Sequence, residues 1–172
     1  GGLNWTISGN VIADYQKDGG NYVSYHGFLK GNSKNGVFER NLVICEWRHS
    51  GGIRVGLSFG GGGSETEAIC QDFDCTNRHS SGVVRNNIVM NCPGDIGIYV
   101  NKGKDTRIYN NLLFNAGGID VRYPESNAVL RNNIVSASIR ARDGGRFSEE
   151  ANIIAGGWIG QLLGPGARYL KR

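Results

Sequence analysis

Short apolar segments recur along the chain, and an asparagine stands directly in front of each of them. The contexts read ISGNVIAD, FERNLVIC, VRNNIVMN, IYNNLLFN, LRNNIVSA and EEANIIAG. These asparagines are Asn10, Asn41, Asn87, Asn111, Asn133 and Asn152, at successive intervals of 31, 46, 24, 22 and 19 residues. A motif that returns in this way is typical of a protein built from stacked coils. The amide of asparagine has both a donor and an acceptor, so we expect aligned copies to bond to one another along the stack.

Each coil is predicted to contain short strands rather than helices. Gly and Asn, which are frequent in the repeats, are poor helix formers, and no segment of ordinary helix length has an apolar stripe of helical spacing. One strand points an apolar residue inward three positions before the asparagine, and another strand follows the asparagine. The inward residues of the former are Phe38, Val84, Ile108 and Leu130, and the latter starts with Leu42-Val43, Ile88-Val89, Leu112-Leu113, Ile134-Val135 and Ile153-Ile154.

A third strand per coil is predicted from residues 51–57, 97–101, 118–122 and 138–142, which align on one register. Alternate side chains of a strand face opposite ways, so two rows point inward. These rows are Ile53, Ile98, Ile119 and Ile139, then Val55, Val100, Val121 and Ala141. The row between them, Arg54, Tyr99, Asp120 and Arg140, points outward. Gly52, Gly97 and Gly118 are placed together at one corner, where a residue without a Cβ is easiest to accommodate.

Together these strands indicate an all-β, single-stranded parallel β-helix, a solenoid of about six coils. Its 172 residues are most simply one domain, 1–172, with an inserted loop at 60–79 and a cap at 156–172 over the last coil. Trp5 is expected to cover the first coil. If it does not, upstream coils or a second copy of the chain should cover that end, which makes a homo-oligomer or a longer parent protein the two alternatives.

The sequence resembles the bacterial right-handed parallel β-helix repeat proteins, a superfamily of pectate-lyase-like and chondroitinase-B-like enzymes. The runs that carry the resemblance are VRNNIVMN, TRIYNNLLFN, GGIDVR, LRNNI and RARDGG, within about residues 3–155. The resemblance implies a right-handed coil, an extracellular or periplasmic location, and cleavage of acidic polysaccharides by β-elimination, often with Ca²⁺. These motifs are core and turn positions, so they indicate the fold more specifically than the activity.

Charge and composition limit the classes of binding partner that we expect. The net charge of +4 and the isoelectric point near 9.0 suit an anionic polymer. No zinc-finger spacing, helix-turn-helix or basic aromatic sheet motif is present, so we expect no nucleic-acid partner. No stretch approaches the roughly 20 apolar residues of a membrane span, so we expect no membrane partner either.

The four cysteines fall into two pairs. Cys70 and Cys75 flank QDFD in the insertion and predict a local disulfide, with a zinc site shared with His79 as the weaker alternative. Cys45 and Cys92 are one step out of register and are predicted to be buried thiols. The run 60–63 of four glycines lacks the Lys-Ser/Thr of a phosphate-binding loop, so it is interpreted as a hinge.

The outward row is the candidate functional site. Arg54, Tyr99, Asp120 and Arg122 are the candidate catalytic residues, and Arg140, Arg142 and Lys102 the candidate substrate-binding residues. Arg pairs bidentately with carboxylates, so a strip of them can hold an acidic sugar chain. Elimination needs the substrate carboxylate to be neutralised by Arg or Ca²⁺, and a base such as Tyr99 or Lys102 with a lowered pKa. Hydrolysis would instead use two carboxylates, for which Asp95 and Asp120 are available.

Two other interpretations stay open. Arg and Asp on adjacent exposed strands also form plain ion-pair ladders, so the chain is alternatively a non-catalytic structural or interaction scaffold. An insertion that folds over the outward row would favour the carbohydrate function, whereas an insertion elsewhere would favour the scaffold. His26, His49 and His79 are scattered over turns and loops, where structural roles are commoner than catalytic ones.

Overall fold

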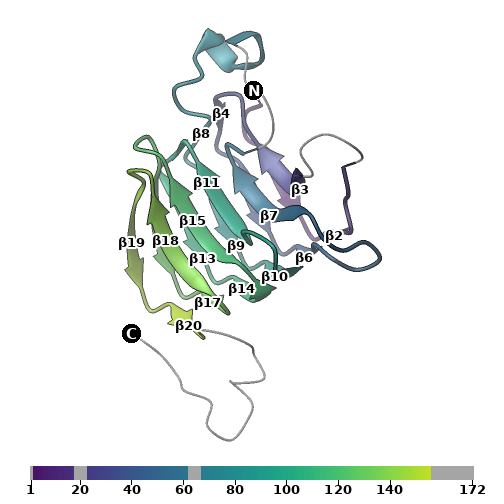
Figure 1. Ribbon diagram of the computed structural model, residues 1–172. Helices are drawn as coiled ribbons and strands as arrows, with labels where there is room; N and C mark the ends of the chain where they lie inside the picture. The colour runs from purple at the N-terminus through teal and green to yellow at the C-terminus, as the bar shows by residue number, and fades with distance from the viewer. Residues whose placement is uncertain (1, 18–22, 62–66, 156–172) are drawn as a thin grey trace, which may run out of the picture.

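The computed structural model describes residues 2–17, 23–61 and 67–155 of the chain. The backbone winds as a right-handed parallel β-helix in which successive coils lay their strands side by side (Figure 1). The pairings between these strands are parallel. The fold class predicted from the asparagine repeat is therefore confirmed.

Two of the sheets have six strands each. In spatial order the first sheet contains β1 (Thr6–Ser8), β5 (Val37–Glu39), β9 (Val83–Arg85), β13 (Thr106–Tyr109), β16 (Asn127–Arg131) and β19 (Arg146–Glu150). The second sheet contains β2 (Val11–Ala13), β6 (Leu42–Ile44), β10 (Ile88–Cys92), β14 (Leu112–Ala116), β17 (Ile134–Val135) and β20 (Ile153–Ile154).

The third sheet has five strands and a fourth, shorter sheet has three. The third contains β3 (Val23–Leu29), β7 (Ile53–Phe59), β11 (Ile98–Asn101), β15 (Gly118–Arg122) and β18 (Ser138–Arg142). The fourth contains β4 (Ser33–Lys34), β8 (His79–Ser80) and β12 (Gly103–Lys104). Two short 3₁₀ helices, η1 (Glu67–Ile69) and η2 (Gln71–Phe73), lie in the insertion. The sequence predicted the three long sheets and missed the fourth, whose two-residue strands are too short to show a period.

The core is a set of aligned apolar rows inside the coils. Phe38 pairs with Val84, Val84 with Ile108, and Ile108 with Leu130, and all four side chains are buried as predicted. The second sheet contributes Val43, Val89, Leu113 and Val135, which are each fully buried. Because like residues stack on like, each coil completes the apolar surface that its neighbour cannot bury alone.

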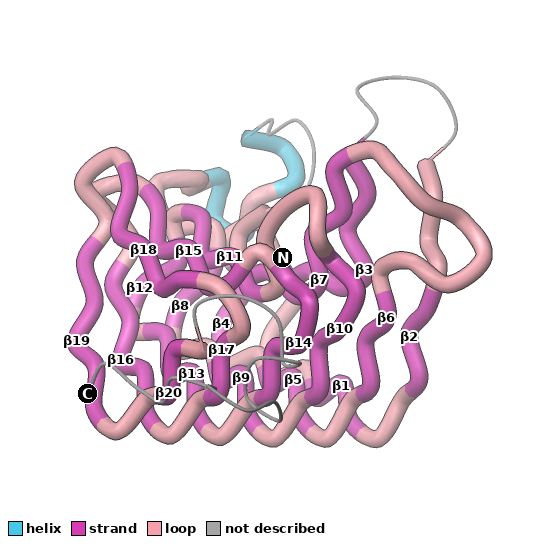
Figure 2. Tube along the Cα trace, turned by 60° about the horizontal axis from the view of Figure 1, so that its bottom comes forward, coloured by secondary structure: helices cyan, strands magenta, loops and turns pink. Residues whose placement is uncertain are grey.

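The asparagine ladder runs along the turns between the first and second sheets, which Figure 2 shows as a row along one edge. The Oδ1 atom of Asn111 accepts two bonds from the preceding coil, from the backbone N–H and from Nδ2 of Asn87, each 3.0 Å long. Asn111 in turn donates from Nδ2 to Oδ1 of Asn133 at 2.9 Å and to the carbonyl of Val84 at 2.9 Å. The same pattern continues from Asn10 to Asn152. These turns therefore bury polar groups without leaving the ladder amides unpaired.

The residue before each ladder asparagine explains the recurring Asn-Asn pairs. It has a positive φ in every coil, in the left-handed region where Gly and Asn are least strained. Three copies use asparagine there, Asn86, Asn110 and Asn132, with φ of 55°, 55° and 54°.

Replacing an asparagine inside the ladder should be far more costly than replacing the one at its exposed end. Asn111→Ala removes the acceptor of the backbone N–H of Asn87 in a buried turn, together with one partner of Asn87 Nδ2 and the amide donor to the carbonyl of Val84, so we expect a loss of about 3 kcal/mol in the free energy of unfolding. Asn10→Ala, at an exposed position, should cost less than about 1 kcal/mol. Urea denaturation of both variants measures the difference, and equal losses would contradict a stabilising role for the ladder.

The register predicted for β7 is wrong by four residues. Ile98 pairs with Leu57 rather than with Ile53, and Val100 pairs with Phe59 rather than with Val55. Ile53 is consequently 42% exposed, while Leu57 and Phe59 are buried in the core. Both registers keep the period of two, so alternation alone could not choose between them.

The shifted register also changes which glycine of β7 lies at the corner of the coil. Gly56, not Gly52, lies beside Gly97, because the N–H of Leu57 bonds to the carbonyl of Gly97 at 2.9 Å. A Cβ on Gly56 would lie 2.4 Å from that carbonyl oxygen, so this corner requires glycine.

The predicted buried thiols Cys45 and Cys92 are in fact joined in a disulfide, across 47 residues of sequence. The residue between Met90 and Cys92 accounts for the error. Asn91 has a φ of 55°, a left-handed turn that β6 lacks between Ile44 and Cys45. The additional residue is taken up in this turn, which brings Cys92 beside Cys45 despite the offset in sequence. The predicted Cys70–Cys75 disulfide is confirmed.

The two disulfides should differ in their effect on stability. In the chain-entropy account, a bridge across 47 residues contributes about 4 kcal/mol and a bridge across 5 residues about 2 kcal/mol. We expect Cys45→Ala/Cys92→Ala to lower the free energy of unfolding more than Cys70→Ala/Cys75→Ala. Urea denaturation of the two double variants tests this order, and a larger loss in the second would contradict it.

The outer face of the second sheet carries an apolar row. Its members follow the ladder asparagines and pair in register, from Val11 through Leu42, Ile88, Leu112 and Ile134 to Ile153. Val11 is 66% and Ile88 43% exposed. This row is an exposed apolar surface outside the core.

The two predicted caps have different outcomes. Trp5 does not close the first coil, since its side chain is 58% exposed and its ring packs beside Gly2. The predicted cap at 156–172 lies outside the described residues. Upstream coils and a second copy of the chain therefore both stay predictions.

Candidate functional site

Five residues on the outer face of the third sheet form what we call the arginine face: Tyr99, Asp120, Arg122, Arg140 and Arg142. Strand pairing places Tyr99 beside Asp120 and Asp120 beside Arg140. It also places Arg122 beside Arg142, two residues further along. The structure thus brings together five of the seven predicted site residues on adjacent strands.

Arg54 does not belong to this face. Because of the shifted register, Ser58 takes the place beside Tyr99, and Arg54 pairs with Ser24 of β3. Its guanidinium donates to the backbone carbonyls of Cys45, at 3.0 Å, and Tyr15, at 3.0 Å. With a relative exposure of 2%, Arg54 is buried and joins a corner of the first two coils, so the structure does not bring it together with the other candidate residues, and its catalytic role stays a prediction.

Asp120 orients the two arginines of β18, Arg140 and Arg142. Its carboxylate is fully buried, with Oδ1 2.7 Å from Nε of Arg140 and Oδ2 3.0 Å from Nη1 of Arg142. The contact to Arg140 is a hydrogen bond, whereas that to Arg142 is a charge contact without hydrogen-bond geometry. The side chains of Arg140 and Arg142 stay 44% and 37% exposed. One buried carboxylate therefore orients two guanidinium groups whose other edges face solvent.

Arg122 has three partners of its own. It forms an ion pair with Asp143, lies over the ring of Tyr123 at 4.7 Å, and donates to the hydroxyl of Tyr99 at 3.4 Å. The hydrogen bonds to Tyr99 and Asp143 raise the pKa of Arg122 above its ordinary value. Its charge is accordingly permanent and partly offset by a neighbouring carboxylate.

The two predicted bases are poorly placed for proton abstraction. Tyr99 is 5% exposed, and burial raises the pKa of its hydroxyl, whereas a base would need a lowered one. Lys102 lies just beyond β11, with Nζ 3.8 Å from a carboxylate oxygen of Glu125. Neither residue has the environment that elimination requires.

The carboxyl pair considered for hydrolysis is partly assembled. Burial raises the pKa of Asp95, and the charge of Asp120 raises it further, while Arg142 and Arg140 oppose the shift. The two groups are thus close enough to influence each other. Asp120, however, is fully buried and already paired, so a substrate or water could not reach it without displacing the arginines.

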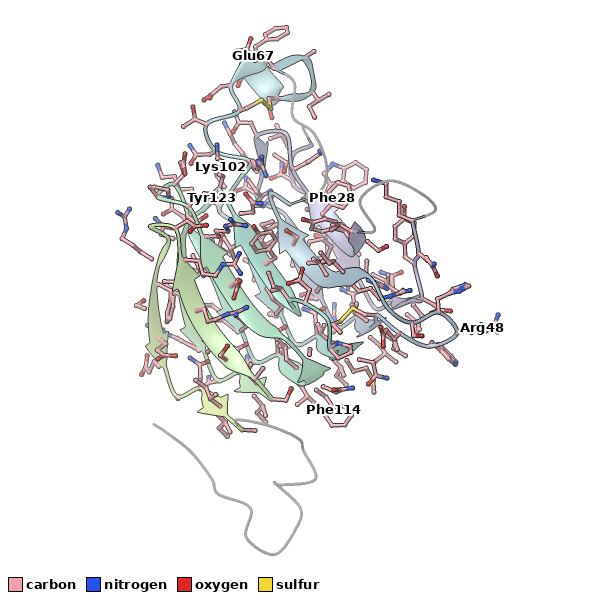
Figure 3. The ribbon with its side chains drawn as sticks, viewed as in Figure 1. Phe28, Arg48, Glu67, Lys102, Phe114 and Tyr123 are labelled. Carbon is pink, nitrogen blue, oxygen red and sulfur yellow. A yellow bond between two sulfur atoms is a disulfide. The ribbon has the colours of Figure 1, made fainter. Side chains whose placement is uncertain are left out.

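The part of the insertion that the structure describes does not cover the arginine face. Residues 67–79 pack at the end of the coils, where the N–H of Gln71 bonds to the carbonyl of Gly31 at 2.9 Å and Asn32 bonds to the carbonyl of Gln71. Figure 3 shows Glu67 standing beyond Lys102 and Tyr123 at the upper end of the third sheet. An insertion that lies away from the outward row was expected to favour a scaffold over a carbohydrate-binding protein. This position therefore favours the scaffold interpretation.

The metal alternatives for this insertion lack ligands. Cys70 and Cys75 are consumed by their disulfide, so they cannot bind zinc with His79. The carboxylate of Asp74 accepts the backbone N–H of Thr76 within its own loop. Among residues 2–17, 23–61 and 67–155, no three His, Cys, Asp or Glu side chains gather as a metal site.

His79 is a structural residue of the fourth sheet. It is fully buried, stacks on Phe59 at 4.1 Å, and accepts the N–H of Gly36 on Nε2 at 3.2 Å. Nδ1 therefore carries the proton and donates to Ser33 Oγ at 2.7 Å. Burial lowers the pKa of His79 to about 4, so the ring is neutral at pH 7.

This histidine should make the protein acid-sensitive in a defined range. The unfolded chain binds a proton at His79 below a pKa of about 6.5, whereas the folded protein does so only below about 4. The stabilisation is therefore complete above pH 6.5 and is lost as the pH falls toward 4, by about 3 kcal/mol. Urea denaturation of wild type and His79→Gln across this range isolates the effect, because the other titrating groups are common to both. Parallel pH profiles would contradict it.

Comparison with known proteins does not place the chain in a family: no family model matches it, and neither a curated protein nor a solved structure does. The resemblance to β-helix polysaccharide enzymes therefore stays a prediction. Among the described residues, no helix is long and apolar enough to cross a membrane.

Proposed function

We propose that this protein binds an acidic polysaccharide along the arginine face and does not cleave it. The observation that carries the proposal is the buried carboxylate of Asp120, which holds Arg140 and Arg142 in fixed orientations while leaving them partly exposed. Guanidinium groups held in this way lose little freedom on binding, so their bidentate pairing with a carboxylate is favoured.

A linear polymer suits the arrangement better than a small anion. Arg122 and Arg142 lie on neighbouring strands and Arg140 two residues away, so the donors extend along the sheet at intervals of about 5 to 7 Å. Acid groups that repeat along a sugar chain can engage such a row together. The net charge of +4 supports attraction of a polyanion at long range.

Binding without cleavage follows from the chemistry of the same face. Elimination requires an accessible base, yet Tyr99 is buried with a raised pKa and Lys102 is paired with Glu125. The two disulfides fit an oxidising compartment, and an extracellular or periplasmic location, where such polymers occur, is part of the proposal. The involvement of Ca²⁺ is tested by the chelator arm of the experiment below.

Affinity electrophoresis in polygalacturonate and alginate gels tests the proposal. Arg140→Ala/Asp120→Asn removes the fixed guanidinium without leaving a buried charge unpaired, and we expect it to weaken binding about tenfold. Arg131→Ala/Glu150→Gln is the matched control, since it removes an exposed ion pair of the first sheet with the same zero change in net charge. The control should bind as the wild type does.

Three outcomes would count against the proposal. No retardation of the wild type, or equal retardation of both double variants, would exclude binding through this face. A rise in the ultraviolet absorbance of unsaturated sugars, measured with Ca²⁺ and with a chelator, would show that the protein is a lyase instead.

A non-catalytic interaction scaffold is the second candidate, and a second observation favours it beside the position of the insertion. The apolar row from Val11 to Ile153 exposes aliphatic side chains continuously along the outer face of the second sheet. Contiguous exposed apolar surface commonly marks contact with another protein. This candidate gains if no acidic polymer retards the wild type.

A further inference from the structure

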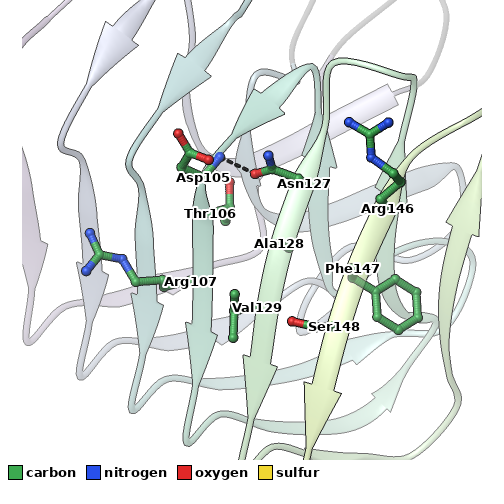
Figure 4. Close-up of a pocket in the computed structure, with 9 residues that line it drawn as sticks. All are labelled: Asp105, Thr106, Arg107, Asn127, Ala128, Val129, Arg146, Phe147 and Ser148. Atoms are coloured by element: carbon green, nitrogen blue, oxygen red, sulfur yellow. Dashed lines mark hydrogen bonds between the residues drawn. The ribbon is translucent and has the colours of Figure 1, made fainter.

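A second group of arginines lies on the outer face of the first sheet, around a hollow of 480 Å³. Arg107 of β13 and Arg146 of β19 line opposite ends of it, with Val129 of β16 between them (Figure 4). The hollow is within the size range of small-ligand sites. It lies on a different sheet from the arginine face.

These two arginines differ from those of the arginine face because, among the described residues, they have no partners. Both are exposed, and within the described part of the chain neither guanidinium forms an ion pair or a hydrogen bond. Arg122, Arg140 and Arg142, by contrast, are each paired with a carboxylate. The full charge of Arg107 and Arg146 is therefore available to a ligand.

The floor of the hollow offers further donors and an apolar contact. Oδ1 of Asn127 accepts the backbone N–H of Asp105, which orients the amide and leaves Nδ2 free to donate. Ser148 presents a hydroxyl in the same row as Arg107 and Val129. A half-buried valine between polar groups suits the apolar face of a sugar ring, and the amide and hydroxyl suit its hydroxyl groups.

The spacing of the arginines defines the ligand further. Strand pairing puts Arg107 in register with Val129 and Ser148, and Arg146 two residues before Ser148. Two strand spacings and two residues along a strand separate their Cα atoms by about 12 Å. A ligand that carries two acid groups can therefore pair with both guanidinium groups at once, one bidentate contact to each.

We propose that this hollow is a binding site for an oligosaccharide bearing at least two carboxylate or sulfate groups, one held by Arg107 and the other by Arg146. The site goes beyond the function proposed above, because it uses another sheet and other residues. Asp105 at its rim carries the one carboxylate that lines the hollow, and it opposes an anion there.

Calorimetric titration with a galacturonate hexasaccharide, and with its sulfated and its neutral galactose counterparts, tests the site at low salt. Arg107→Ala/Arg146→Ala should lose one class of binding site, with affinity there at least about tenfold weaker. Asp105→Asn should bind about threefold more tightly at that site, because it removes a like charge. Both changes are at exposed positions without partners, so folding should be unaffected. Arg48→Ala, on the loop between β6 and β7, is the charge-matched control for the single variants Arg107→Ala and Arg146→Ala, and it should bind as the wild type does.

The same titrations separate this site from the arginine face. If both exist, the wild type binds two short ligands, and Arg107→Ala/Arg146→Ala and Arg140→Ala/Asp120→Asn each lose a different one. Unchanged stoichiometry and affinity in Arg107→Ala/Arg146→Ala would overturn the second site even where the arginine face binds. Equal binding of the neutral hexasaccharide, or no effect of Asp105→Asn, would also overturn it. The carboxylated and sulfated arms show which acid group the site prefers.

Discussion

A turn that buries polar backbone in every coil must satisfy its donors and acceptors, and the asparagine ladder meets this constraint. Each amide inside the ladder accepts two bonds from the preceding coil and donates to the next, so adjacent coils are joined at fixed height and register. Because the turns are fixed in this way, the strands on either side of them stay in register from coil to coil. The inward residues Phe38, Val84, Ile108 and Leu130 therefore stack on one another. The stacked core, and the flat outer faces on which both proposed sites lie, depend on that alignment.

Much of this architecture could be predicted because the signal is local and repeated. The ladder, the inward rows and two of the three long sheets follow from a motif of about eight residues that recurs with the same alternation. The register of β7 could not be obtained in this way, since Ile53-Val55 and Leu57-Phe59 have the same period and similar composition. The choice depends on contacts that periodicity does not contain, namely the close approach of Gly56 to Gly97 and the burial of Arg54 among the carbonyls of the first two coils. The Cys45–Cys92 bridge was missed for a similar reason, because a single left-handed residue, Asn91, compensates an offset that the sequence shows as a mismatch.

Candidate sites are harder to predict than folds because charge in a sequence carries no information about pairing. The outward alternation grouped Tyr99, Asp120 and Arg140, but it left open whether the arginines are free cations or members of an ion-pair ladder. In the structure each of Arg122, Arg140 and Arg142 has a carboxylate partner. Arg107 and Arg146 show the reverse. They occupy outward positions by the same alternation, and their availability emerges only because no acid stands beside them across the strands. A strip of basic residues on a β-helix therefore has to be judged by its neighbours on adjacent coils, which lie some twenty residues away along the chain.

The position of the insertion relative to the longer disulfide has a consequence for the response of the protein to proteases. The two short helices of the insertion, η1 and η2, project from the end of the coils, which makes this segment accessible to a protease. They also lie between Cys45 and Cys92 in the chain. A single cut there would yield two polypeptides that remain covalently tied and still interlocked by parallel strands on both sides of the break. The protein can in this respect tolerate a cut in the insertion, and a nicked form would separate into fragments only after reduction.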